Sequence, residues 1–243
     1  MHRLFRRARI PEEASLDLGD ETVAIAVRVV RKARHYRLAF DPRRGAVLTF
    51  PGNGRWVEAE DFLRRQRDWL KTRLDRAAPQ IRFAEGAEIP LRGMAHRIVS
   101  TGALRGRVSI AERDGAAALL VPGGEHLARR LTDWLKAEAK RDLAPAVARH
   151  AANLGVRPGA ISLRDQSSRW GSCSASGRLS FSWRLILAPG FVLDYVAAHE
   201  VAHLVEMNHS PAYWRVLRRA LPDMERGRDW LHANGRGLHA YGG

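Results

Sequence analysis

Residues 199–209 read His-Glu-Val-Ala-His-Leu-Val-Glu-Met-Asn-His and contain the residue types that a metal site requires. His199 and His203 are four residues apart, so on a helix their imidazoles share one face and can bind one metal ion. Glu200 lies beside the first histidine, where a carboxylate can take a proton from the attacking water. His209 follows ten residues after His199. We expect the helix to end between them, so that the chain turns back and brings a third imidazole to the metal.

Three histidine ligands leave the fourth position of a tetrahedral zinc site open, which distinguishes a catalytic site from a closed structural one. The sequence therefore predicts one Zn²⁺ per chain. Glu206 shares a helical face with the two histidines, but it lies roughly 7 Å further along the helix axis than a metal between them. We expect it to support the site or face solvent. His232 is the reserve ligand if His209 does not bind.

The surroundings of the two histidines predict a helix buried on most sides. Pro189-Gly190 marks its start, and Asn208 marks its end because asparagine tolerates left-handed backbone geometry. Ser210-Pro211 reads as the N-cap and first residue of a second helix that continues to about Leu221. The apolar surround consists of Phe191, Val192, Tyr195, Val196, Val201, Ala202 and Leu204.

Residues 169–188, which begin Arg-Trp-Gly-Ser-Cys, precede Pro189, the His-Glu-x-x-His helix and Asn208-His209-Ser210-Pro211. Together they resemble the YgjP-like metal-dependent hydrolase family, a bacterial relative of the SprT-like and WLM zinc metallopeptidases. The resemblance implies that the three histidines are ligands, that Glu200 is the catalytic base and that residues 169–173 lie near the site. Ser182 departs from the asparagine expected there. The metzincin alternative is rejected, because Glu206 replaces the required glycine and no Met-turn is evident.

Three further residues are predicted to contact substrate: Arg169, Trp170 and Tyr213. Arg169 can bind a substrate carboxylate or phosphate, or stabilise an oxyanion, whereas the alternative is an ion pair with Asp165. Trp170 and Tyr213 are expected in the core or in the pocket wall. Cys173 is expected to be a buried free thiol, because no base for a catalytic cysteine is identifiable.

The formal net charge is +15, and the 41 cations include only four lysines. This skew is typical of a GC-rich coding sequence, but it also allows binding of nucleic acid or nucleotide. Arg64, Arg65 and Arg67 fall in one predicted helix, and such runs are usually solvated helix faces. Non-specific binding of polyanions is expected at low salt.

The periodicity of the chain predicts an α+β fold: a minimal zincin-like core, with long helix, small sheet and metal helix, after a β-rich N-terminal leader subdomain. Residues 1–120 would form the leader with one helix, and residues 121–243 the metallohydrolase core. Strands at 23–30, 36–40 and 46–50 read as an antiparallel meander. No internal repeat is evident. The remaining predicted elements are a helix at 56–76, hairpins at 92–93 and 114–115, a helix at 125–153 kinked or broken at Pro145, strands at 161–164, 169–172 and 179–183, and a final helix at 222–233.

One cysteine excludes an internal disulfide framework and suits a reducing compartment. No apolar run approaches the roughly eighteen residues of a membrane span, and no apolar stretch follows the basic N-terminus as in a signal peptide. We therefore expect a cytoplasmic protein without a membrane partner.

The residues favour a zinc-dependent hydrolase, and a metallopeptidase acting on peptide or protein is the first hypothesis. The first alternative is a nucleoside triphosphate pyrophosphohydrolase of UTP type at the same metal site, an activity that the resemblance suggests. The second alternative is a DNA-associated SprT-like protease. A metal-binding scaffold without activity is disfavoured, because Glu200 is present.

Overall fold

The computed structural model describes residues 10–19, 22–41, 45–75, 80–166 and 169–242. The chain forms two compact units, residues 1–79 and residues 80–243, and it is a mixed α+β protein as predicted. The division falls at 79/80 and not at the predicted 120/121. The strands between residues 88 and 121 belong to the second unit because Ile98 and Leu119 share a hydrophobic core with Leu131 and Trp183.

The first unit is a four-stranded sheet covered on one face by two helices. The strands are β1 (Glu13–Asp17), β2 (Thr22–Val30), β3 (Arg37–Asp41) and β4 (Gly45–Pro51), and the helices are α1 (Trp56–Arg65) and α2 (Arg67–Asp75). Buried side chains of both layers, among them Leu48, Phe50 and Leu63, form its core.

The predicted antiparallel meander is wrong. The strand order is β1-β2-β4-β3, and β2 and β4 are parallel. Alternating hydrophobicity locates strands, but it does not say which strands pair. The predicted strands also do not include β1, the fourth strand of this sheet. The single helix predicted at 56–76 is divided at Gln66, whose backbone leaves helical geometry at φ −91° and ψ 4°.

The second unit begins with a similar sheet. Its strands are β5 (Glu88–Leu91), β6 (Met94–Ser100), β7 (Ser109–Arg113) and β8 (Ala116–Val121), in the order β5-β6-β8-β7. Both predicted hairpins are confirmed. Their two-residue turns have positive φ at both positions, 52° and 82° at Arg92-Gly93 and 52° and 75° at Asp114-Gly115, as type I′ turns require.

The two sheets have the same topology. In each, the first two strands pair antiparallel, the second and fourth pair parallel, and the third and fourth pair antiparallel. Leu48 and Leu119 occupy equivalent places: each is fully buried and is paired on both sides. A Pro-Gly pair follows each sheet, and Asp-Trp-Leu-Lys recurs in the helix beyond it, at 68–71 and 133–136. The expectation of no repeat is therefore wrong. We call residues 13–75 the first module and residues 88–154 the second module.

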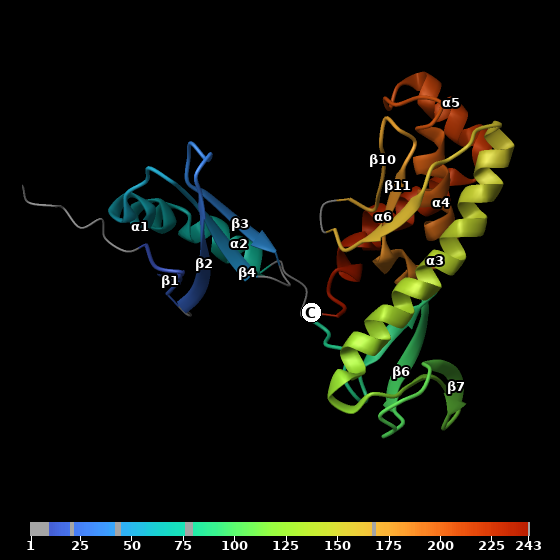
Figure 1. Cartoon of the computed structure of the whole chain (residues 1–243), viewed down its shortest axis with the longest axis horizontal. Helices are drawn as coiled ribbons and strands as arrows, with labels where there is room; N and C mark the ends of the chain where they lie inside the picture. Colours follow the sequence, from blue (N-terminus) through green and yellow to red (C-terminus); the bar gives the residue numbers. More distant parts are fainter. Residues whose placement is uncertain (1–9, 20–21, 42–44, 76–79, 167–168, 243) are drawn as a thin grey trace, which may run out of the picture. The chain divides into compact units, whose positions relative to one another are not determined.

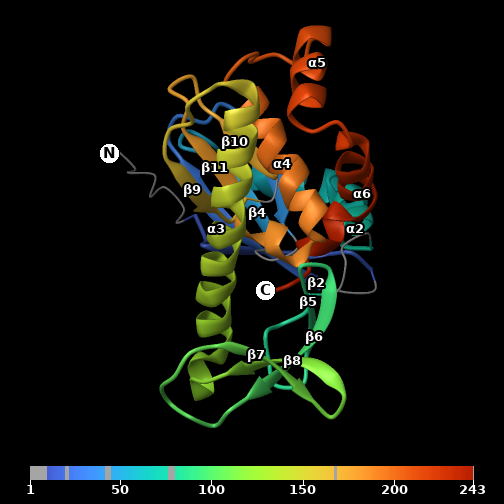
Figure 2. The same cartoon turned by 90° about the vertical axis from the view of Figure 1, so that its right-hand side faces the viewer.

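A short turn, η1 (Gly124–His126), leads into α3 (Leu127–Leu154), which links the second module to the rest of the unit. Figures 1 and 2 show α3 running from β5–β8 at one end to α4 at the other. Pro145 lies inside α3 and does not end it, so of the predicted kink or break the break does not occur. Packing accounts for this, since Leu143, Ala146 and Val147 around the proline are all buried against the core.

The last part of the chain forms a three-stranded sheet and three helices. Its elements are β9 (Ile161–Arg164), β10 (Gly171–Cys173), β11 (Leu179–Ser182), η2 (Trp183–Leu187), α4 (Gly190–Ala202), α5 (Pro211–Ala220) and α6 (Met224–Leu238). The strand order is β10-β11-β9. α6 continues past its predicted end at Asn234-Gly235. Gly235 does not end the helix but allows a close contact, since an added Cβ would lie 3.3 Å from the Trp170 ring. No helix in the described residues has the length and apolar character of a membrane span.

A buried ionic contact fastens α3 to α4 and α5. His150 is 1% exposed; its Nε2 lies 2.7 Å from Asp194 Oδ1, and its Nδ1 lies 3.2 Å from the carbonyl oxygen of Ala220. Arg149 also binds Asp194. Burial alone would raise the pKa of Asp194, but the hydrogen bond and charge of His150, with the charge of Arg149, bring it below its usual value.

We expect Asp194→Asn to lower the free energy of unfolding by about 2–3 kcal/mol at pH 7, because the buried His150 loses its carboxylate partner. A carboxyl with a depressed folded pKa stabilises the protein above its unfolded pKa of about 3.9 and loses that contribution as pH falls through the folded value. The gap between wild type and variant should thus close below about pH 4. Urea unfolding across this range measures it, with the exposed Arg149→Gln as a milder control. Equal stability at pH 7 would contradict the prediction.

Candidate metal centre

The helix and turn that carry the three histidines are ordered by local chemistry. α4 ends at Ala202, with His203 as its C-cap, so the helix stops before the predicted exit at Asn208. The chain then turns, and α5 starts at Pro211 after Ser210, whose side chain accepts a hydrogen bond from the Tyr213 backbone N–H at 3.3 Å. The predicted Ser-Pro start of the second helix is confirmed. This tight corner brings the segment around residue 209 back beside α4.

The corner places the three imidazoles together. One nitrogen from each of His199, His203 and His209 lies within 4.8 Å of the others. The Nε2 atoms of His199 and His209 are 3.2 Å apart. Two nitrogens on one tetrahedral zinc ion, each about 2.0–2.1 Å from it, are separated by about 3.3–3.4 Å. The donor set and its spacing therefore fit a zinc ion.

The protonation states of the histidines also suit metal binding. Burial, with the charges of His203 and His209, lowers the pKa of His199 to about 3, so this ring is neutral at neutral pH. Burial likewise lowers the pKa of His203, partly offset by a bond to the Glu206 carbonyl. That bond joins His203 Nδ1 to the carbonyl oxygen at 3.1 Å and leaves the Nε2 lone pair for a metal.

Glu206 is not part of the three-histidine cluster. Since α4 ends at Ala202, Glu206 is no longer on the helical face of the histidines. Its side-chain oxygen instead accepts a hydrogen bond from the Asn208 backbone N–H at 3.3 Å, within the turn. This agrees with the expectation that Glu206 supports the corner.

Tyr213 supports the cluster from behind. It is fully buried, and its hydroxyl donates to the backbone carbonyl of His199 at 3.1 Å. Its ring centroid lies 5.4, 4.6 and 4.7 Å from the rings of His199, His203 and His209. Burial raises the pKa of Tyr213 well above its usual value. The substrate contact predicted for Tyr213 does not agree with this position, because its hydroxyl is engaged inside the protein and the cavity is lined by other residues.

Glu200 is buried next to the cluster, with 4% of its surface exposed. Burial raises the pKa of its carboxyl to about 7, and the positive charge of Arg169 opposes the rise. A cation in the site would lower this pKa again. The carboxyl lies directly against β10: a Cβ built at Gly171 would be 2.4 Å from Glu200 Oε1. Gly171 therefore leaves the space that this side chain occupies.

A cavity of about 470 Å³ opens over the histidines. Arg169 lines it and donates to the Gln166 side-chain oxygen at 2.7 Å, whereas Asp165 accepts from Arg184. Trp170 also lines it and stacks on His239, with ring centroids 4.6 Å apart. The cavity residues are Arg169, Trp170, Gly171, Ser172, Cys173, Tyr195, Val196, His199, Glu200, His203, Met207, His209 and Leu231. Two of the three predicted substrate contacts, Arg169 and Trp170, thus lie beside the three histidines.

Sequence reasoning missed two residues of this site. Tyr195 was counted only as part of an apolar surround, but it lies one turn before His199 and lines the cavity. The i, i+4 spacing was the available signal. Gly171 carried no signal, because its role depends on the packing of β10 against α4. Cys173 lines the cavity as a free thiol whose pKa is raised by burial and by the Glu200 charge, which fits the expectation that it is not a nucleophile.

We expect Gly171→Ala to reduce kcat by about 10²-fold, because a displacement of a catalytic group by about 1 Å has an effect of this size. The new methyl group must push the Glu200 carboxylate away from its place, while the histidines stay where they are. Gly190→Ala is the matched control, since a Cβ there meets nothing within 4 Å. Turnover and zinc content of both variants measure the effect. Equal turnover of the two variants would show that Gly171 does not position Glu200.

Three clustered imidazoles next to a buried glutamate define the site of a metal-dependent hydrolase. Residues 34–234 match the YgjP-like family, metallopeptidase domain, and the chain belongs to this family. No curated protein matches the chain. Among solved structures, the chain is similar to the crystal structure of the metallopeptidase zymogen of Pyrococcus abyssi abylysin, with 19% sequence identity over 38% of this chain and 93% of that chain, at a TM-score of 0.35.

Proposed function

We propose that this protein is a zinc-dependent peptidase that binds one Zn²⁺ per chain through His199, His203 and His209 and uses Glu200 as its general base. The observation that carries the proposal is the convergence of the three imidazoles beside a carboxyl that is 4% exposed. We read α3, the sheet β9–β11 and α4 as a minimal zincin-like core. The lone cysteine suits the cytoplasm as its location.

The protein's own groups supply a proton path. A zinc ion bound to the three imidazoles would supply Lewis acidity, polarising the scissile carbonyl and acidifying water. The Glu200 carboxylate takes the proton of the attacking water and then passes it to the leaving amine. Burial raises the pKa of its carboxyl, which makes it a stronger base, and the charge of a bound zinc ion would oppose this rise. Arg169 lines the same cavity and offers a fixed positive charge for a substrate carboxylate or a developing oxyanion.

The strand β10 supports a peptide as the substrate. Its three residues line the cavity, and β10 is an edge strand that pairs only with β11 among the described strands. Unpaired N–H and C=O groups on an edge can hydrogen-bond an extended peptide, which would place its backbone next to Glu200. An edge strand beside the base thus favours peptide hydrolysis.

Arg169 keeps a second substrate class open: the phosphoanhydride of a nucleoside triphosphate, of which UTP is the first to test. A guanidinium binds phosphate as well as carboxylate, and water activation by Glu200 serves either bond.

Incubation of the zinc-loaded protein with a denatured protein, a peptide library and nucleoside triphosphates tests the proposal. We expect new amino termini and no pyrophosphate or phosphate. Glu200→Gln runs beside the wild type in each arm, so that activity of a contaminant is recognised. Phosphate or pyrophosphate release that depends on Glu200, without new amino termini, would replace the peptidase proposal by the nucleotide one.

A further inference from the structure

The two modules share a scaffold but differ in how their charges are distributed along the strands. Residues 22–40 of the first module contain five cations and no acid. All five are exposed, and we call them the basic patch: Arg28, Arg31, Lys32, Arg34 and Arg37. None of them has a hydrogen bond or ion pair to another side chain within the described part of the chain. Their charge is therefore available to a ligand.

Two cations of the basic patch, Arg28 and Arg37, lie on the open face of the sheet. Arg28 on β2 and Arg37 on β3 are both register partners of Thr49 on β4, so the three residues form one row. Residues in one row point to the same face of a sheet. The opposite face carries the buried Ile25 and Leu48, which pack under α1 and α2. The row thus lies on the face away from the helices.

The other three cations extend the patch beyond this row. Arg31, Lys32 and Arg34 follow the end of β2 and line a hollow of about 640 Å³ together with Gly52 and Asn53. Residues 31–34 and residues 52–53 approach each other closely, since a Cβ added at Gly52 would lie 3.0 Å from the Arg31 Cα.

The second module shows that the sheet does not need Arg28 and Arg37. The row equivalent to Arg28, Thr49 and Arg37 consists of Val99, Leu120 and Ser109. The same strand order and pairing form without either arginine. Arg28 and Arg37 are therefore available for a role other than holding the sheet.

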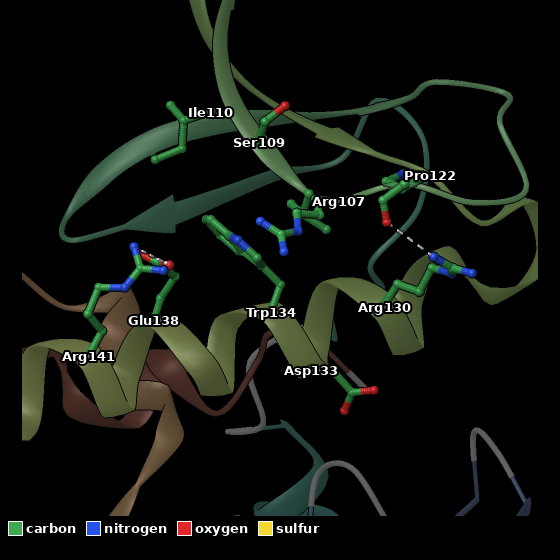
Figure 3. A pocket seen from close by; sticks show the side chains of 11 residues that line it. Arg107, Ser109, Ile110, Pro122, Arg130, Asp133, Trp134, Glu138 and Arg141 are labelled. Atoms are coloured by element: carbon green, nitrogen blue, oxygen red, sulfur yellow. Dashed lines mark hydrogen bonds and ion pairs between the residues drawn. The ribbon is translucent and has the colours of Figure 1, made fainter.

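Several cations elsewhere in the described part of the chain are engaged in internal bonds. Figure 3 shows the hollow between α3 and the loop before β7 in the second module, where Arg141 reaches Glu138. Arg130 donates to the carbonyl oxygens of Leu104 and Gly106. On α1 of the first module, Arg64 and Arg65 both pair with Asp61. The basic patch differs from these groups because no acid accompanies it.

We propose that the basic patch binds the phosphate backbone of a nucleic acid. Five exposed cations, two on the sheet and three in the adjoining segment 31–34, match a ligand with closely spaced negative charges, and duplex DNA carries one per about 1.7 Å of axis. An anionic membrane fits less well, since the loop at residues 31–35 offers no large apolar side chain to insert between lipids. The site belongs to the first module and does not depend on the proposed peptidase activity.

Fluorescence anisotropy of the full-length protein with a labelled duplex of about 20 base pairs, over a series of salt concentrations, tests the proposal. The test variant is Arg31→Gln/Lys32→Gln/Arg34→Gln. The matched control is Arg64→Gln/Arg65→Gln/Arg67→Gln, which removes the same charge from the same module. Loss of three phosphate contacts should reduce the slope of log K against log salt by about 2.7 and weaken binding at least about tenfold at 0.1 M salt. The control should keep the wild-type slope.

A second variant controls for misfolding of the first. Arg28→Val/Arg37→Ser installs the residues of the second module, so the sheet should form as before while DNA affinity falls. Circular dichroism and zinc content check the fold of every variant. Equal losses in the test and control triples would overturn the proposal, because binding would then follow net charge alone. Binding to phosphatidylserine vesicles without binding to DNA, or no binding to either, would also overturn it.

Discussion

Replacing Glu200 with glutamine is expected to lower kcat by about 10²–10⁴, or roughly 3–5 kcal/mol of barrier, while zinc content stays normal. Glutamine has the shape of glutamate and fits the same space beside Gly171, but it has no basic oxygen. The loss should fall mainly on kcat because ground-state contacts are preserved. The same loss is expected for a peptide and for a phosphoanhydride, since both reactions require an activated water.

Glu206→Gln is the control for this experiment. It makes the same chemical change six residues further along the chain, where the carboxylate only accepts a bond from the Asn208 backbone. Turnover of this variant should remain near that of the wild type. Near-normal turnover of Glu200→Gln with zinc bound would remove the proposed mechanism, and the metal would then have to be regarded as structural.

The part of the site that could be predicted from sequence is the part determined by local spacing. Two histidines four residues apart meet on any helix, and Ser210-Pro211 specifies the start of a helix wherever it occurs. The helix end was placed too late because Asn208 suggested a stop, whereas the turn begins at His203, within the motif. The third imidazole could be expected beside the other two because only a short turn separates it from them.

Features set by long-range packing could not be read in this way. Gly171 gained its role from the approach of β10 to Glu200, and Tyr213 from its position beneath three imidazoles. Strand pairing also depends on long-range packing, since β2 pairs with β4 although β3 lies between them in the sequence. The repeat was hidden because the modules share few residues beyond the Pro-Gly pair and Asp-Trp-Leu-Lys, while strand order and register preserve it. Charge is read well from composition, but only the structure shows which arginines have partners.

Replacing His209 with alanine is expected to raise the Kd for zinc at least about 100-fold, because losing even a residue that only supports a ligand costs about 10–100-fold. His209 is the proposed ligand that lies in the turn rather than in α4, so its replacement leaves His199 and His203 in place and tests the third ligand alone. Competition with a chelator measures the affinity, and elemental analysis measures the zinc content.

His232→Ala is the matched control for this substitution, because His232 lies on the exposed surface of α6 and outside the three-histidine cluster. It should bind zinc like the wild type. In the wild type, zinc affinity should fall in acid, since an imidazole must be neutral to bind metal, and the lowered pKa values of His199 and His203 place their protonation below the usual imidazole range. Full zinc content in His209→Ala together with loss in His232→Ala would transfer the third ligand to α6. The corner between α4 and α5 would then have a structural role only, and the spacing of His209 from His199 would have no part in the chemistry.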